Sequence, residues 1–502
     1  MNKNNLIALA FILLCHIAFG QEAKENYVLI QPGDTEKDII AKAANVTPSP
    51  RQLRWQQLEL TAFFHFGINT FTDKEWGDGT EDPQIFNPTA LDAKQWVLAA
   101  KNAGIKQVII TAKHHDGFCL WPTATTNHSV AASPWKAGKG DVVKEVAGAC
   151  RAYGIGFGIY VSPWDRNASV YGTDAYNDFF VAQLTELLTR YGRVDEVWFD
   201  GANGEGPNGK KQVYDFERWY QLIRNLQPAA TIAIMGPDVR WVGTESGYGR
   251  ETEWSVVPAN NLDQAEIASG SQRDLVFKPQ GDMTGNDLGS REKILNAKGL
   301  VWYPAETDVS IRPGWFYHAK EDDKVKTPKK LQDIYYSSVG RNGVLLLNIP
   351  PDKQGVIHKN DVANLVAWRK MIAGTFAVNL ANGAGTNIGK SGKHMLDGDY
   401  DTYWITKRKD TTAVIELNLK GSKTFDVLLL QENITIGQRI EKFVLEYQEG
   451  NEWKTIATGT TVGYKRLIRF DPVTAKKVRL RILSSRLNPT LSELGLYKQV
   501  QP

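Results

Sequence analysis

The chain has 502 residues, of which 42% are hydrophobic and 23% charged, and this composition excludes a disordered or low-complexity protein. Its length predicts two packed domains, because single hydrophobic cores stop growing at roughly 250–300 residues. The formal net charge is +3, and the sequence holds no block of clustered Lys and Arg, which argues against a nucleic-acid partner. Aromatic residues make up 10% of the chain and permit the stacking of sugars on Trp and Tyr.

The first twenty residues have the pattern of a cleaved signal peptide. Lys3 precedes an apolar run from Leu6 to Phe19, and small residues stand at Ala18 and Gly20. A run of about 14 apolar residues is shorter than the ~20 that a membrane span needs. We therefore expect residues 1–20 to direct export to the periplasm or the extracellular space, with no membrane span. Leu14 disfavours a lipid anchor at Cys15, because a small residue is expected before a lipid-modified cysteine.

The mature chain then keeps two cysteines, Cys119 and Cys150. These residues either form one disulfide in an oxidising compartment or remain two buried thiols. In both cases the fold does not depend on a framework of disulfides.

Apolar runs of strand length alternate with helical patterns over residues 21–355. The expected strands are 62–66, 107–111, 156–161, 196–199, 231–235, 301–303 and 344–349, and the expected helices include 92–103, 141–153 and 178–191. This alternation is typical of a parallel sheet buried on both faces. With an eighth strand expected near residues 251–256, the pattern predicts an α/β fold, a (β/α)8-type barrel. No GxGxxG motif follows the first strand, which argues against a dinucleotide-binding fold.

The pattern changes after Pro350-Pro351. A connecting helix is expected within residues 356–375. From 376 to 502, short alternating runs separated by turn residues predict a C-terminal antiparallel β-sandwich. The expected strands there are 413–419, 426–432, 443–447, 467–470 and 477–482.

Polar residues stand where five of the expected barrel strands end. They are His65, His114, His115, Asp116, Trp164, Asp165, Asp200 and Asp238. The C-terminal ends of barrel strands carry the catalytic groups in this architecture. One such residue is more often a structural hydrogen-bonding group, but five ends together indicate a ligand, because a buried acid or imidazole is costly without a compensating partner. We therefore expect a ligand site at the barrel mouth.

Two carboxylates are candidates for the chemistry at this mouth. Asp200 follows Val197-Trp198-Phe199 and precedes Gly201, and Glu245 lies in a Gly-flanked loop at 243–247. Glycoside hydrolysis needs two such groups, one to attack or support the anomeric carbon and one to protonate the leaving oxygen. The alternative for Asp200 is a cap on the turn that follows it.

Six segments resemble, in chain order, the α-L-fucosidases of glycoside hydrolase family 29. They are Pro48-Ser49-Pro50-Arg51-Gln52-Leu53, Glu75-Trp76, His114-His115-Asp116-Gly117-Phe118, Ser162-Pro163-Trp164-Asp165, Trp198-Phe199-Asp200-Gly201 and Ile311-Arg312-Pro313-Gly314-Trp315-Phe316-Tyr317. The resemblance covers the barrel almost end to end. It implies an exo-acting glycoside hydrolase that needs no cofactor and no metal, with fucosylated oligosaccharides or glycoconjugates as its partners.

The resemblance also implies roles for single residues. Asp200 would be the nucleophile, and Trp315 would lie against the fucose methyl group. The expected substrate-binding residues are His65, Glu75, Trp76, His114, His115, Trp164, Asp165, Asp238 and Trp315. Asp238 belongs to the segment 238–247 that we expect to hold the aglycone sugar.

The segment from Arg240 to Ser255 resembles the branch of the family that is selective for α-1,3- and α-1,4-linked fucose. In that branch a Glu of this loop is the general acid/base, which implies Glu245. Thr244 stands where members commonly have Asn, and Glu251 and Glu253 remain rival acids. In the C-terminal region, Leu396-Asp397-Gly398-Asp399 and Thr402-Tyr403-Trp404 resemble discoidin-like carbohydrate-binding modules.

Three alternatives stay open at this stage. A metal-dependent hydrolase would use His65, His114, His115 and Asp200 as ligands, but the sequence holds no HExxH motif and no Cys pair for zinc. A glycan-binding lectin with an inactive barrel is disfavoured by the presence of both candidate carboxylates. A fucosidase of broad specificity, acting on aryl and α-1,2-linked fucosides, is the nearest alternative.

Overall fold

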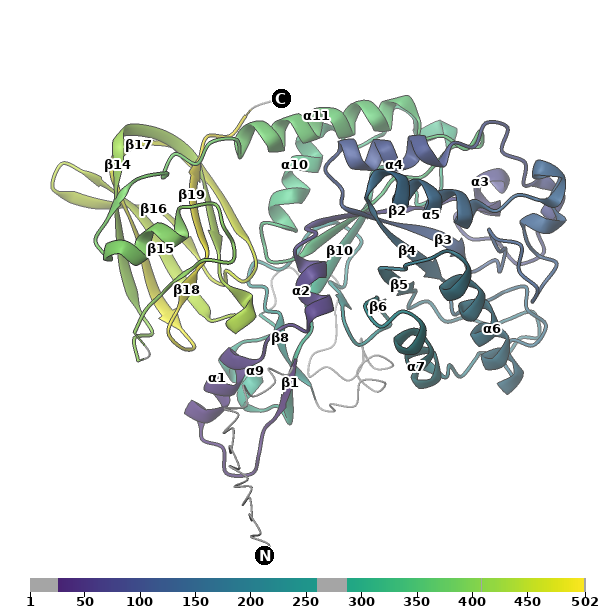
Figure 1. Ribbon diagram of the computed structural model, residues 1–502, viewed down its shortest axis with the longest axis horizontal. Helices are drawn as coiled ribbons and strands as arrows, with labels where there is room; N and C mark the ends of the chain where they lie inside the picture. The colour runs from purple at the N-terminus through teal and green to yellow at the C-terminus, as the bar shows by residue number, and fades with distance from the viewer. Residues whose placement is uncertain (1–25, 260–286, 408, 501–502) are drawn as a thin grey trace, which may run out of the picture.

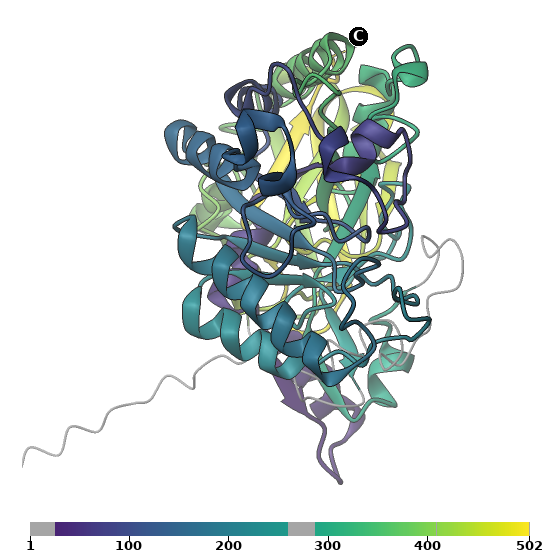
Figure 2. The ribbon, with the colours of Figure 1, turned by 90° about the vertical axis from the view of Figure 1, so that its right-hand side faces the viewer.

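The computed structural model describes residues 26–259, 287–407 and 409–500, so the expected signal peptide at 1–20 lies outside the described residues. Figure 1 shows a barrel on one side of the molecule and a C-terminal sheet domain on the other. The long helix α11 (Lys359–Thr375) runs between them. In Figure 2 the barrel faces the viewer and the C-terminal strands lie behind it.

An eight-stranded parallel sheet forms the near-closed barrel, in the order β6-β5-β4-β3-β2-β11-β10-β7. Its strands are β2 (Leu60–Phe64), β3 (Gln107–Lys113), β4 (Gly156–Val161), β5 (Glu196–Phe199), β6 (Thr231–Ile234), β7 (Arg240–Trp241), β10 (Ala305–Ser310) and β11 (Val344–Asn348). The interior is packed by alternate residues of several strands, among them Phe63, Ile109 and Leu346. The predicted fold class, a barrel followed by an antiparallel sheet domain, is confirmed.

Helices cover the outside of the barrel, and several of them begin at a residue whose side chain caps the first turn. They include α4 (Ala93–Asn102), α5 (Val142–Tyr153), α6 (Asp174–Arg190), α7 (Phe216–Leu226) and α10 (Pro328–Ser337). The side chains of Asp92, Asp141 and Asp215 accept backbone N–H groups at the first turns of α4, α5 and α7. At the end of α5, Gly154 takes the left-handed conformation that a helix C-terminus commonly needs.

The prediction is wrong for two of the eight barrel strands. The run 301–303 falls largely in β9 (Gly299–Trp302), which pairs with β1 (Tyr27–Leu29) and β8 (Val256–Ala259) in a separate antiparallel sheet. The segment 251–256 is not a barrel strand either. The barrel instead uses β7 and β10, whose sequences lack an apolar run because β7 has two residues and β10 reads Ala-Glu-Thr-Asp-Val-Ser. Every residue of β10 is nevertheless buried.

The C-terminal domain is built from antiparallel strands. Its larger sheet has the order β12-β14-β17-β15-β16, with β19 also paired to β14, and β13 pairs with β18. The strands are β12 (Gly385–Thr386), β13 (Trp404–Ile405), β14 (Ala413–Gln431), β15 (Ile440–Glu449), β16 (Glu452–Gly459), β17 (Arg466–Ser485), β18 (Thr490–Leu491) and β19 (Glu493–Tyr497). The four expected runs at 413–419, 426–432, 467–470 and 477–482 join into the two long strands β14 and β17.

The remaining helices connect these units. In the part of the chain that the structure describes, they are α1 (Glu36–Asn45), α2 (Pro50–Gln56), α3 (Ile68–Thr72) and α9 (Arg291–Leu295), with short 3-10 helices at Pro83–Ile85, Val130–Ala132, Trp135–Gly138, Ala319–Glu321, Gly389–Met395 and Ile434–Ile436. Cys119 and Cys150 are both free and buried, and burial raises the pKa of Cys150 to about 12. Within the described ranges, no helix combines the length and apolarity that a membrane span requires.

Candidate active site

A cavity of about 160 Å³ opens at the C-terminal ends of the barrel strands. It is lined by Phe63, His65, Glu75, Trp76, His114, His115, Tyr160, Trp198, Asp200, Ala202, Glu245, Asp308 and Trp315. His65, His114 and Asp200 directly follow β2, β3 and β5. The structure therefore brings eight of the eleven predicted site residues to one pocket.

Asp200 is held in one orientation by two hydrogen bonds. Its Oδ1 accepts the N–H of Ala202 at 2.7 Å, and its Oδ2 accepts the hydroxyl of Tyr160 at 3.0 Å. Burial and the charge of Asp200 raise the pKa of Tyr160 well above its ordinary value, so the phenol keeps its proton and donates. The Asp200 side chain stays 24% exposed, and its carboxylate therefore faces the pocket.

His115 presents a hydrogen-bond acceptor to the pocket. Its Nδ1 lies 2.7 Å from Ser162 Oγ, and that hydroxyl donates to the carbonyl of Trp164. Because the Ser162 hydrogen is used there, Nδ1 of His115 carries the proton and Nε2 keeps its lone pair. This Nε2 lies 3.9 Å from Asp200 Oδ2. Burial lowers the pKa of His115, which favours the neutral ring.

His65 and His114 are also neutral. His65 Nδ1 donates to Asn348 Oδ1 at 2.9 Å, since an amide oxygen only accepts, and this leaves Nε2 as an acceptor. Burial lowers the pKa of His65 to about 4 and that of His114 well below its ordinary value. The His114 ring stacks on Tyr160 with an interplanar angle of 12°. The three imidazoles can thus accept hydrogen bonds from hydroxyl groups at neutral pH.

Trp315 links the second predicted carboxylate to the rest of the pocket. Its indole Nε1 donates to Glu245 Oε2 at 3.2 Å, and its ring lies 5.1 Å from that of His65. Its backbone N–H donates to Glu75 Oε2 at 2.8 Å. Trp76 stands at the same rim with 55% of its surface exposed. Indole faces and carboxylates together suit a ligand with an apolar side and several hydroxyl groups.

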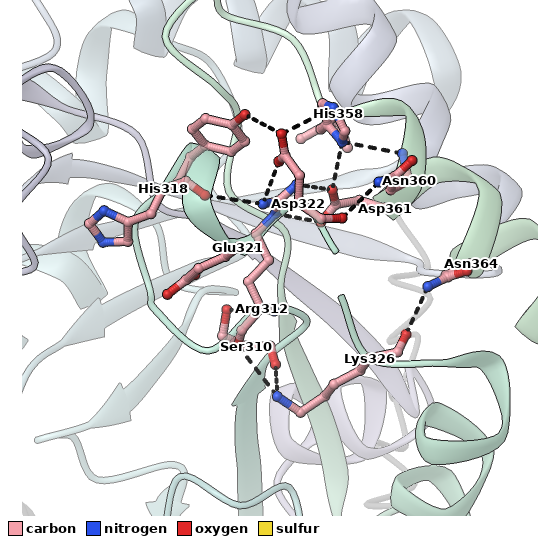
Figure 3. A network of polar contacts seen from close by, with 12 residues as sticks. Ser310, Arg312, His318, Glu321, Asp322, Lys326, His358, Asn360, Asp361 and Asn364 are labelled. Atoms are coloured by element: carbon pink, nitrogen blue, oxygen red, sulfur yellow. Dashed lines mark hydrogen bonds and ion pairs between the residues drawn. The ribbon is translucent and has the colours of Figure 1, made fainter. Parts of the chain in front are cut away.

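Arg312 anchors the rim loop, residues 311–327 between β10 and α10, which carries Trp315. The buried guanidinium makes two hydrogen bonds to Asp361 of α11, at 2.6 and 3.0 Å, and a third to Asp322 at 2.9 Å. Figure 3 shows this network, with Lys326 also bonded to the carbonyl of Ser310. A bidentate Arg–carboxylate pair fixes geometry as well as adding energy. The network therefore determines where the rim loop leaves β10.

The two rival acids do not line the pocket. Glu251 forms ion pairs with Arg341 at 2.7 Å and with Arg466 of the C-terminal domain. Glu253 is buried between Arg240 and Arg250. Of the three carboxylates in this segment, Glu245 is the one at the pocket, and its side chain is exposed.

Three predicted substrate-binding residues lie outside the pocket lining. Trp164 packs behind it, with its ring 5.0 Å from His115 and its Nε1 bonded to the carbonyl of Glu205. Asp165 forms a buried ion pair with Lys113 at 2.9 Å, so its carboxylate has a structural partner. Strand-end position alone did not distinguish these residues from those that face the cavity.

Asp238 does not lie at the barrel mouth, so its predicted role in substrate binding is corrected. It accepts the N–H of Ile232 at 2.8 Å and forms ion pairs with Arg51 at 3.0 Å and Arg224 at 2.5 Å. Ile232 lies near the start of β6, so Asp238 sits at the N-terminal end of the strands, opposite the mouth. The chain turns back directly after β6 and does not form a rim loop there.

Five lining residues were not predicted: Phe63, Tyr160, Trp198, Ala202 and Asp308. Tyr160 and Trp198 lie inside predicted strands. Alternate side chains of a strand point into the barrel, and the apolar runs do not show which set does so. Asp308 belongs to β10, which the sequence did not predict as a strand because it has no apolar run. Its Oδ1 accepts from Trp241 Nε1 at 2.8 Å. Burial, together with the charges of Glu245 and Asp200, raises the pKa of Asp308 to about 8, so it is protonated at neutral pH.

The side chains of the alternative metal site do share this pocket. Among the residues that the structure describes, however, no three His, Cys, Asp or Glu side chains are grouped so that they could hold a metal ion. The Nδ1 atoms of His65 and His115 are bonded to protein oxygens. A barrel mouth that places Asp200 and Glu245 in one pocket with neutral imidazoles and indoles instead fits a glycoside hydrolase.

Comparisons with known proteins define the family. The alpha-L-fucosidase family model matches residues 50–371, and the F5/8 type C domain model matches residues 381–493. The chain is 44% identical over 464 residues to Alpha-L-fucosidase 1 of Arabidopsis thaliana, covering 90% of this chain and 87% of that protein. It therefore belongs to the α-L-fucosidases of glycoside hydrolase family 29, and the predicted enzyme class is confirmed.

Solved structures agree with this assignment. A putative alpha-L-fucosidase from Bacteroides ovatus is 52% identical, with a TM-score of 0.85 over 95% of this chain and 78% of that one. A family 29 fucosidase of Ruminococcus gnavus in complex with fucose is 33% identical, with a TM-score of 0.80 over 91% of this chain and 96% of that one. The protein is an α-L-fucosidase that acts on fucosylated glycans.

Proposed function

We propose that the enzyme hydrolyses terminal α-L-fucosides with net retention, by double displacement. A carboxylate of Asp200 attacks the anomeric carbon, while Glu245 gives its proton to the departing glycosidic oxygen. Glu245 then removes a proton from water, whose oxygen displaces Asp200 and releases fucose. The observation that carries this proposal is the position of both carboxylates in one pocket, with Asp200 held by Tyr160 and Ala202.

The same pocket supports fucose as the bound sugar. Lone pairs on His65 and His115 and the carboxylate of Glu75 suit the hydroxyl groups, and Trp315 suits the C6 methyl group. Buried polar groups reject a sugar that lacks a matching hydroxyl, because they are then left unpaired. The solved complex of the Ruminococcus gnavus relative with fucose supports the choice of ligand.

The proposed linkage preference is α-1,3 and α-1,4 fucose on branched, Lewis-type oligosaccharides. It rests on the resemblance of the segment 240–255 and on the place of Glu245 and Trp241 beside the pocket, whereas Asp238 no longer contributes. We expect Lewis-type trisaccharides to show higher kcat/KM values than an aryl fucoside or an α-1,2-linked disaccharide. Equal or higher values for the α-1,2 disaccharide would favour the broad-specificity alternative.

Following the anomeric proton by NMR during hydrolysis tests retention directly. The proposal predicts α-L-fucose as the first-formed product, with the β-anomer appearing later by mutarotation. Asp200→Asn should lose several decades of kcat, because the attacking group is removed. First-formed β-L-fucose, or an Asp200→Asn rate within about tenfold of wild type, would refute double displacement on Asp200.

We further propose that residues 1–20 direct export and are then removed, so that the enzyme acts in the periplasm or outside the cell. The support is the pattern of Lys3 and the apolar run from Leu6 to Phe19. N-terminal sequencing of the protein recovered from the periplasm or the medium should begin at or near Gln21. Recovery of the uncleaved chain from the cytoplasm would contradict export.

A further inference from the structure

His318 lies between two carboxylates at the edge of the pocket. Its Nδ1 is 2.7 Å from Asp73 Oδ1, and its Nε2 is 2.6 Å from Glu75 Oε1. Figure 3 shows the His318 ring at the left of the view, pointing away from the Arg312 network. A carboxylate only accepts hydrogen bonds, so both ring nitrogens must carry a proton for both bonds to form. The arrangement is thus complete only when His318 is an imidazolium.

This ring joins two segments that both contribute side chains to the pocket. Asp73 and Glu75 follow α3, whereas His318 belongs to the rim loop that carries Trp315. Glu75 also accepts the N–H groups of Trp315 at 2.8 Å and Phe316 at 3.3 Å. One carboxylate of the pocket wall is therefore held by the imidazolium and by two backbone groups of the facing loop.

The approach of the two loops is close at Gly314. A Cβ at this position would lie 2.5 Å from Glu75 Oε1 and 3.0 Å from His318 Cδ2, so a side chain there would separate the loops. Gly314 N–H also donates to Glu321 at 3.1 Å. The position of Glu75 is thus set by contacts on several sides, and His318 supplies the charged one.

The charged groups around His318 come from several segments. Asp73 and Glu75 face its ring, Arg312 donates to its carbonyl at 3.5 Å, Glu321 binds Gly314, and Lys320 and Lys353 act on Asp73 through their charges. Burial alone lowers the pKa of His318, but the hydrogen bonds and charges of Asp73 and Glu75 outweigh it and raise the pKa above 6.5. The hydrogen bond to His318 also lowers the pKa of Asp73.

We propose that His318 is a positioning residue that ties Asp73 to Glu75 and thereby sets the affinity of the pocket for fucose. The proposal rests on the proposed role of this pocket as the fucose site. When His318 loses a proton at alkaline pH, one of its two carboxylate bonds loses its donor. Glu75 and the Trp315 loop then lose a shared anchor, and fucose binding weakens while the atoms that react stay in place.

Calorimetric titration with L-fucose at about pH 6 and about pH 9 tests this inference. For wild type we expect the Kd to rise roughly three- to tenfold between these pH values, since part of the energy of one charged hydrogen bond is lost. His318→Gln keeps the size of the side chain but cannot carry charge. It should bind L-fucose weakly at both pH values, with little pH dependence of its own.

A second variant separates titration of His318 from a general loss of structure. Asp73→Asn keeps an oxygen that accepts from Nδ1 but removes the negative charge that favours the imidazolium. It should move the midpoint of the Kd-against-pH curve to lower pH. Asp308, whose pKa is raised to about 8, also titrates in this range, but its midpoint is not expected to follow Asp73→Asn. His394→Gln is the control, because His394 lies 3.7 Å from Asp397 in the C-terminal domain and does not line the pocket.

The outcomes are distinct. Wild-type binding that weakens with pH, a flat His318→Gln profile and a shifted midpoint in Asp73→Asn support the proposal. Tight, wild-type-like binding by His318→Gln at both pH values overturns it, as does an unshifted midpoint in Asp73→Asn. If wild type binds no L-fucose at any pH, the fucose pocket itself is wrong, and the proposed function fails together with this inference.

Discussion

The protonation of the pocket residues follows from their hydrogen-bond partners. His65 and His115 each donate through Nδ1 to a protein oxygen, so the nitrogen left over accepts. Tyr160 donates to Asp200, and Asp308 is a neutral acid at neutral pH because burial raises its pKa to about 8. The site therefore combines acceptors for sugar hydroxyls with a fixed carboxylate.

The role of Glu245 leads to a prediction about leaving groups. A sugar hydroxyl leaves poorly without a proton, whereas an activated aryl group leaves without help. Glu245→Gln should lower kcat/KM for a fucosylated oligosaccharide by roughly 10²–10⁴-fold, but that for an activated aryl fucoside by less than about tenfold. Azide should restore turnover of the aryl substrate. The control is Glu251→Gln, which removes a carboxylate outside the pocket. If Glu251→Gln or Glu253→Gln, rather than Glu245→Gln, loses oligosaccharide cleavage while keeping aryl-fucoside cleavage, the assignment of the acid to Glu245 is wrong.

Asp308 leads to a prediction about stability and pH. The folded protein keeps the Asp308 proton up to about pH 8, whereas an unfolded chain releases it near the ordinary value of 3.8. Raising the pH from 3.8 to about 8 therefore lowers the free energy of unfolding, and Asp308 causes no further loss above about pH 8. Asp308→Asn does not titrate, and its amide oxygen can still accept from Trp241. Its free energy of unfolding relative to wild type should rise by ~1 kcal/mol or more between about pH 5 and pH 8 in urea titrations. A difference that does not change with pH contradicts the buried neutral acid.

How far single residues were predictable depended on their neighbours in the sequence. Asp200 could be predicted from the sequence, because it ends an apolar strand directly before a glycine. Asp238 instead follows the apolar run 231–235 after Gly236-Pro237. A Gly-Pro pair predicts a turn but not where the chain goes next, and here the chain turns back, so that Asp238 lies at the other end of the barrel. Asp308 was missed because its strand is polar and buried, so periodicity gave no sign of it.

At the scale of elements, the rim loop after β10 is the segment on which the pocket depends most. It carries Trp315 and His318, and Arg312 anchors it to α11 through Asp361. The barrel strands with apolar runs were predicted within a few residues, whereas β7 and β10 were not. Their polar side chains are paired by buried ion pairs and hydrogen bonds, such as that of Arg240 with Glu253, which a hydrophobic pattern does not report.

The anchor can be tested with two carboxylates that bind the same guanidinium. Asp361→Ala leaves the buried Arg312 without its bidentate partner and should lower the free energy of unfolding by ~3–5 kcal/mol. Asp322, with a third of its side chain exposed, is the matched control, and Asp322→Ala should cost clearly less. Chemical denaturation of both variants measures the difference. Similar losses in the two would show that the bidentate pair does not anchor the loop.

At the scale of the whole molecule, the C-terminal domain packs directly on the barrel. Val427, Leu429 and Leu467 share a hydrophobic core with barrel residues such as Tyr335. Ion pairs join Lys465 to Glu59 at 2.5 Å and Arg469 to Asp333 at 2.7 Å. Two separate patterns in the sequence predicted two domains, but nothing in either pattern showed that their cores would meet.

This shared core predicts that the barrel depends on its partner domain. A chain that ends after residue 375 exposes the barrel side of the interface, and we expect it to aggregate or to unfold at least 10 °C below the full chain. Domains of a multi-domain chain often unfold separately, but because these two share a core, the full chain should unfold in a single transition in calorimetry. A truncated protein that stays soluble with unchanged Tm and kcat/KM would show that the interface contributes little.

The proposed double displacement requires Asp200 to form a covalent bond with the sugar. A 2-deoxy-2-fluoro-fucosyl donor with a good leaving group slows the second displacement and should let the intermediate accumulate. Mass spectrometry of the intact protein should then show the mass of one added fluorosugar, and peptide mapping should place it on Asp200. A label on another residue would contradict the account, as would an absence of any adduct while the donor is hydrolysed with inversion.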